Sequence, residues 1–79
     1  MSELRLDVRR MLLKRGWHEP KGPGRTMERG RAVWATSNRC GDSSLTAYRD
    51  GRGEFTIAFT SEVPARVIVA ACEIAQVMP

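Results

Sequence analysis

The chain has 79 residues, of which 42% are apolar and 28% are charged, and its formal net charge at neutral pH is +4. This length is that of one small domain over residues 1–79, so a second domain is excluded. A domain of this size buries only about 60% of its unfolded surface, so we expect a marginal core that gains stability from a partner chain.

The composition also excludes several chemistries. The chain has two cysteines, Cys40 and Cys72, and one histidine, His18. A protein-made zinc site uses about four such ligands, so we expect no metal and no cofactor. The N-terminus lacks the pattern of a secretory signal, and the longest weakly polar stretch is too short to span a bilayer. We therefore expect a cytoplasmic protein with reduced thiols.

No catalytic motif is present in the sequence. Residues 22–27, Gly-Pro-Gly-Arg-Thr-Met, depart from the dinucleotide-binding fingerprint at their last position. His18 and Cys40 fall in expected loops without a third group that would orient them as a base and a nucleophile. The carboxylates cluster around expected turns, where Asp forms local hydrogen bonds. We predict that the protein is not an enzyme.

The first expected element is a helix over residues 3–15. Ser2 is a favourable N-cap, and Gly16 is placed to end the helix in a left-handed conformation. In that arrangement Trp17 folds back on Leu12. The apolar residues occupy two opposite faces of this helix, with Leu4, Val8, Met11 and Leu12 on one and Leu6 and Leu13 on the other.

The middle of the chain alternates between apolar and polar residues, which is typical of strands. The Pro- and Gly-rich residues 18–30 predict a loop, and the pattern also permits a short additional strand near Trp17. Residues 38–42 predict a turn, and Asp50-Gly51-Arg52-Gly53 predicts a hairpin. Three strands are expected, over residues 31–37, 45–48 and 55–60.

A second helix is expected after Thr60 or Ser61, with Pro64 in its first turn. Apolar residues surround nearly the whole helix, which is typical of burial on more than one side. We expect one stripe to cover the sheet, formed by Val63, Val67, Ala70, Ala71, Ile74, Val77 and Met78. Outside that stripe lie Ala65, Ile68, Val69, Cys72 and Ala75.

The order α-β-β-β-α predicts an α+β fold, a two-layer sandwich in which two helices cover a three-stranded antiparallel sheet. The expected core consists of Leu4, Val8, Leu12, Trp34, Leu45, Phe55, Ile57, Phe59, Val67, Ala71 and Ile74. The helices carry further apolar residues that cannot all face one sheet. We predict that these form a protein interface, made of Leu6, Leu13, Ile68, Val69 and Cys72.

The leading hypothesis is therefore a non-enzymatic protein that binds a host protein or itself as a homodimer. The alternative is a nucleic-acid-binding module. Residues 1–31 hold nine Lys or Arg against four Asp or Glu, whereas residues 32–79 hold four against five. Such a basic region favours phosphate contacts that weaken with added salt. The candidate contacts are Arg5, Arg9, Arg10, Lys14, Arg15, Lys21, Arg25, Arg29 and Arg31.

Two resemblances accompany these patterns. The order and length resemble the double-stranded-RNA-binding domain, whose second helix begins with a lysine cluster that would fall at residues 62–69. That segment offers only Arg66 beside Glu62, so this resemblance covers topology and not phosphate-binding residues. The segment 54–71, with its F-T-x-x-x-P-A pattern, resembles small uncharacterised domains of actinobacterial phages and plasmids. It implies an origin in a phage or similar mobile element.

Overall fold

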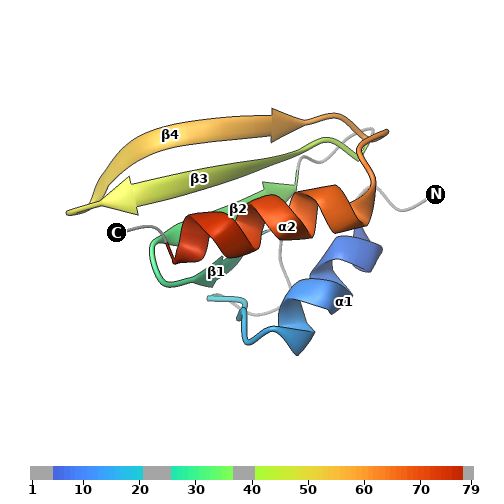
Figure 1. Cartoon of the computed structure of the whole chain (residues 1–79), viewed down its shortest axis with the longest axis horizontal. Helices are drawn as coiled ribbons and strands as arrows, with labels where there is room; N and C mark the ends of the chain where they lie inside the picture. Colours follow the sequence, from blue (N-terminus) through green and yellow to red (C-terminus); the bar gives the residue numbers. More distant parts are fainter. Residues whose placement is uncertain (1–4, 21–25, 37–40, 78–79) are drawn as a thin grey trace.

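The computed structural model describes residues 5–20, 26–36 and 41–77 (Figure 1). Its elements follow the order α-β-β-β-β-α. The bounds are α1 Leu6–Lys14, β1 Thr26–Arg29, β2 Ala32–Thr36, β3 Ser43–Arg49, β4 Arg52–Phe59 and α2 Ala65–Gln76. The α+β class, the two helices and the antiparallel sheet are confirmed, whereas the prediction of three strands is wrong.

The sheet is an antiparallel meander in the order β1-β2-β3-β4. Asp50 and Gly51 connect β3 to β4, with φ angles of 52° and 80°. A two-residue hairpin turn with positive φ at both positions favours Asp-Gly, because glycine has no Cβ and Asp tolerates this conformation. The expected hairpin is confirmed, with Arg52 and Gly53 forming the first residues of β4.

The additional strand β1 lies within residues 18–30, for which the composition predicts a loop. Met27 is its only fully buried residue, so β1 shows no apolar alternation. Its conformation follows from pairing with β2, from Thr26 opposite Ala35 to Arg29 opposite Ala32. On the edge of β1 that faces away from β2, the N–H of His18 donates a 3.1 Å hydrogen bond to Glu28 O, and the N–H of Glu28 donates one of 2.9 Å to His18 O.

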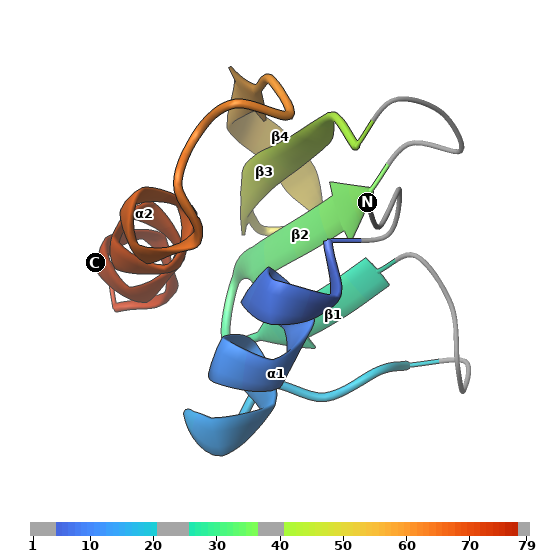
Figure 2. The same ribbon diagram turned by 90° about the vertical axis from the view of Figure 1, so that its right-hand side faces the viewer.

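Both helices lie on the same side of the sheet (Figure 2). α2 packs against α1 and lies over β2 and β3. β4 forms the edge of the sheet beyond α2, and neither α1 nor α2 covers it in the two views (Figures 1 and 2). The two-layer arrangement is therefore present, but the helix layer covers only part of the sheet.

The core is built around the middle of the sheet. Trp34 is the largest fully buried side chain, and its cross-strand neighbours Met27 and Leu45 are equally inaccessible. The other buried apolar residues are Val8, Leu12, Trp17, Ala32, Ala47, Phe59, Ile68, Val69, Cys72 and Ala75. Of the expected core, Val8, Leu12, Trp34, Leu45 and Phe59 are confirmed, Phe55 and Ala71 are partly buried, and Leu4 lies outside the described residues. Ile57 is 40% exposed, so its assignment to the core is wrong.

α2 begins at Ala65 with Pro64 as its N-cap residue, so the expected start after Thr60 or Ser61 is wrong. The expected core face of this helix is wrong as well. Val67 and Ile74 are 47% and 65% exposed, whereas Ile68 and Cys72 are fully buried. Ile68, Val69 and Cys72 therefore belong to the core of the protein and not to an exposed partner interface. The two faces carry side chains of the same kind, so the apolar periodicity alone cannot select between them.

α1 begins at Leu6, after Arg5 in a left-handed conformation, so the expected start at residue 3 is wrong, and Ser2 lies outside the described residues. The expected end of this helix is confirmed. Gly16, with a φ of 87°, donates its N–H to Leu13 O at 3.2 Å, and Trp17 donates to Leu12 O at 3.1 Å. These two bonds form a Schellman motif, which satisfies the last carbonyls of the helix. Trp17 is buried in the core as a result, with 2% of its surface exposed.

Arg5 joins the start of α1 to the segment between β4 and α2. Its guanidinium donates a 2.9 Å hydrogen bond to the carbonyl oxygen of Val63 and forms a 3.0 Å ion pair with Asp7. The hydrogen bonds from Arg5 hold the pKa of the Asp7 carboxyl below its usual value, although partial burial opposes this. This contact connects elements that lie at opposite ends of the sequence.

We expect Gly30→Ala to destabilise the protein more than Gly51→Ala. Both glycines have positive φ, which costs a residue with a Cβ about 1–3 kcal/mol. At Gly30 an added Cβ would also lie 3.0 Å from the backbone oxygen of Gln76, whereas nothing lies within 4 Å at Gly51. Urea unfolding of both variants measures the difference. Equal losses would show that the approach of α2 to the β1–β2 turn is not a tight contact.

Candidate protein-binding surface

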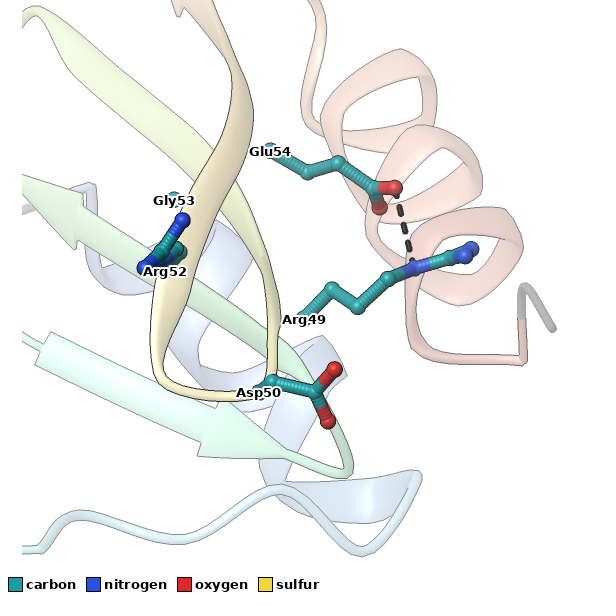
Figure 3. Close-up of a pocket in the computed structure, with 5 residues that line it drawn as sticks. All are labelled: Arg49, Asp50, Arg52, Gly53 and Glu54. Atoms are coloured by element: carbon teal, nitrogen blue, oxygen red, sulfur yellow. Dashed lines mark ion pairs between the residues drawn. The ribbon is translucent and has the colours of Figure 1, made fainter.

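A shallow, open pocket lies at the β3–β4 hairpin, lined by Arg49, Asp50, Arg52, Gly53 and Glu54 (Figure 3). Arg49 and Glu54 point toward one another and form a 3.0 Å ion pair, while Arg52 points away from them. Glu54 also pairs with Arg31 from the β1–β2 turn. The lining therefore consists of two carboxylates, two guanidinium groups and a glycine.

The placement of Glu54 comes from an irregularity in β4. Ala47 lies opposite Phe55 and Tyr48 lies opposite Gly53, so Glu54 is an additional residue in β4. Such a bulge increases the local twist of a strand and redirects a side chain. Here it allows one carboxylate to contact Arg31 from the β1–β2 turn and Arg49 from the end of β3, which fixes the tip of the hairpin relative to β2.

Residues 5–20, 26–36 and 41–77 show neither a metal-ligand cluster nor a membrane-spanning helix. Within these ranges, no three His, Cys, Asp or Glu residues lie together as the ligands of a metal ion would. Over the same residues, neither helix has the length and apolarity required to cross a membrane.

The basic residues of the nucleic-acid alternative are mostly engaged within the protein. Arg5 is 8% exposed, Arg9 pairs with Glu19, and Arg15 pairs with Glu73 at 3.2 Å. Cations that are matched by carboxylates contribute little to a phosphate-binding surface. These three side chains therefore serve to connect elements of the fold.

The remaining basic candidates are spread over the chain. Arg29 donates a hydrogen bond to the backbone oxygen of Arg15, and Arg31 pairs with Glu54. Arg10 and Lys14 are exposed on α1, and Lys21 and Arg25 lie outside the described residues. Five of the seven described candidates, Arg5, Arg9, Arg15, Arg29 and Arg31, thus contact other groups of the protein, which weakens the nucleic-acid hypothesis.

Apolar side chains are exposed on both helices and on β4. On α1, Leu6 and Leu13 are 43% and 50% exposed, so their expected outward position is confirmed. Their participation in an interface stays a prediction. Large apolar residues exposed together on one face of a small protein indicate a binding surface, whereas single exposed residues do not.

The outer side of α2 carries the most extensive of these surfaces. Val67, Ala70, Ile74 and Val77 recur at spacings of three and four residues, so they share one side of the helix. We call these four residues the α2 apolar face. Ile74 and Val77 are 65% and 68% exposed, and the side opposite them packs on the sheet. Soluble helices usually present charged or polar residues in this position.

The helix side of β4 is the second uncovered region. Phe55, Ile57 and Phe59 project to this side, because Phe59 lies opposite buried Ser43 and Ile57 opposite buried Leu45. Phe59 is buried, Phe55 is partly buried, and Ile57 is 40% exposed. Burial therefore decreases from the end of β4 toward its middle, where no helix lies over the strand.

Neither a protein-family model, a curated protein nor a solved structure matches this chain. The arrangement of its own residues is therefore the basis of the functional argument.

We expect Ile74→Glu to leave the protein folded and Ile68→Glu to unfold it. The first substitution places a carboxylate in water, whereas the second buries a charge in the core at a cost of several kcal/mol. Circular dichroism and urea unfolding of both variants distinguish the two faces of α2. A folded Ile68→Glu variant would contradict the orientation of the helix described here.

Cys72 is expected to resist modification in the folded protein. Burial raises the pKa of its thiol to about 12 from 9.0, with a further contribution from the charge of Glu73. Because the neutral thiol is favoured in the folded state, stability from this group is complete below pH 9 and decreases between pH 9 and 12. Thiol labelling of a Cys40→Ser variant at pH 8 measures this, with the urea-unfolded protein as control. Rapid labelling without urea would contradict the burial.

Proposed function

We propose that this protein is a non-enzymatic interaction protein that binds another protein through the α2 apolar face. The observation that carries the proposal is the exposure of Val67, Ile74 and Val77 along one side of a helix. Burial of apolar area contributes about 25 cal/mol per Å², so leaving such a stripe in water forgoes a favourable contact. A partner with its own apolar surface would recover that free energy.

The charge pattern supports a protein partner over a nucleic acid. Arg66 is the only charged residue adjacent to the α2 apolar face on its outer side, while Glu73 is paired with Arg15. Nucleic-acid surfaces concentrate Lys and Arg, whereas the centres of protein interfaces are depleted of charge. The four residues are spaced like the apolar residues by which an amphipathic helix binds in the apolar groove of a partner protein.

Capture from a lysate with immobilised wild-type protein, Ile74→Glu and Leu13→Glu tests this proposal. The two variants add the same charge at exposed positions on different helices. We expect a partner that the wild type and Leu13→Glu retain and Ile74→Glu loses by at least about tenfold, which corresponds to about 1.4 kcal/mol. Equal capture by all three would contradict the role of α2.

Nuclease treatment of the lysate separates the two classes of partner. A partner retained after nuclease is bound through protein contacts. Captured material that disappears after nuclease treatment would instead support the nucleic-acid alternative. In that case, binding should weaken with added salt, and replacing Arg10 and Lys14 should make this salt dependence less steep. Loss of capture by Leu13→Glu alone would place the interface on α1.

A further inference from the structure

β4 is the longest strand and one edge of the sheet. Its eight residues extend over about 27 Å at about 3.4 Å each, and the described residues pair with it only through β3. The opposite edge differs, because β1 has four residues and His18 pairs with Glu28 there. β4 therefore presents a long row of backbone N–H and C=O groups to its surroundings.

Residues 55–59 of β4, the half away from the hairpin turn, lack the features that usually prevent further pairing at such an edge. Natural edge strands are protected by charged side chains, prolines or bulges that prevent further pairing. In β4 the charges and the bulge lie at Arg52 and Glu54, beside the turn. Residues 55–59 contain neither a charge nor a proline, and their side chains on the helix side are apolar.

From this edge we infer that β4 pairs antiparallel with β4 of a second copy of the chain, around a two-fold axis at Thr56. The result is one continuous sheet of eight strands with all four helices on the same side. This inference goes beyond the proposed binding through the α2 apolar face, because it uses a different surface and names one partner, the protein itself.

The charges at the two ends of β4 favour a second copy as the occupant. The turn end carries Arg31, Arg49 and Arg52 against Asp50 and Glu54, so it is net positive. Among the described residues, the far end carries exposed Asp42 and Glu62 with Arg66 at the start of α2. Arg5 at that end is buried and paired with Asp7, so the described residues there are net negative. Antiparallel pairing brings each positive end beside the negative end of the other copy, twice in one dimer.

The side chains of β4 are also complementary to themselves in this register. An axis at Thr56 sets Ile57 of one copy opposite Phe55 of the other, on the helix side of the sheet. This contact covers the apolar side chains that α2 leaves open, and pairs of aromatic and β-branched residues stabilise antiparallel sheets.

On the other side of the sheet, Thr56 would face Thr56 of the second copy. The Thr56 hydroxyl already forms a 3.0 Å hydrogen bond with the Thr46 hydroxyl on β3. Pairing at Thr56 would therefore continue a row of threonines across the dimer, a favourable cross-strand arrangement.

Sedimentation of Thr56→Lys and Thr46→Lys tests the dimer. Both variants lose the same hydroxyl bond, but only Thr56→Lys places two ammonium groups opposite each other at the axis. We expect the wild type and Thr46→Lys to show a concentration-dependent dimer, and Thr56→Lys to raise its Kd by about tenfold or more. A wild type that stays monomeric at millimolar concentration, or equal effects of the two variants, would overturn the inference.

Cysteine cross-linking tests the register. In a Cys40→Ser background, oxidation should link Thr56→Cys to itself, because the two positions are adjacent at the axis. Ala58→Cys is the control, since its two copies would lie four residues apart, about 13 Å, beyond disulfide reach. Cys72 is buried and does not compete. Linking of Ala58→Cys in preference to Thr56→Cys would overturn the axis at Thr56.

The two proposals fail separately in these experiments. A monomeric wild type that still captures a partner through Ile74 overturns the β4 dimer and leaves the α2 apolar face in place. A dimer that Thr56→Lys disrupts, combined with capture that Ile74→Glu does not change, supports the β4 contact and contradicts the role of α2.

Discussion

The lateral position of the helices over the sheet determines which surfaces of this protein are exposed. After α1 the chain turns at Gly16, buries Trp17 and pairs His18 with Glu28 on the edge of β1. α1 is thereby held near that edge, and the Arg15–Glu73 ion pair fixes α2 beside it. Because both helices are held toward β1, the helix side of β4 is left uncovered.

The sequence predicts those elements whose burial is one-sided. β2 and β3 alternate between buried and more exposed residues, so their apolar periodicity is evident without a structure. β1 buries only Met27 and depends on its pairing with β2, which no local pattern reveals. The orientation of α2 is equally inaccessible to sequence analysis, since Val and Ile occupy both of its sides and only its packing on the sheet and on α1 distinguishes them.

The candidate surfaces divide in the same way. Leu6 and Leu13 lie outward as expected because Val8 and Leu12 define a clear buried stripe on α1. Its periodicity assigns the α2 apolar face to the core, and the exposure of this face emerges only once the helix is placed on the sheet. The number of basic residues in the N-terminal part overstates the charge available for phosphate contacts. Folding brings carboxylates such as Glu19 and Glu54 into ion pairs with these arginines.

The contact between Arg5 and Val63 also has a consequence for biosynthesis. The guanidinium at the start of α1 binds a carbonyl that is 58 residues later in the chain, and α1 packs mainly against α2. While a ribosome still holds the C-terminal part, the first helix has neither its anchor nor its packing partner. The native packing of α1 therefore forms only after the α2 segment has left the ribosome, since contacts this distant in sequence form late. Until then, Val8 and Leu12 are available to chaperones.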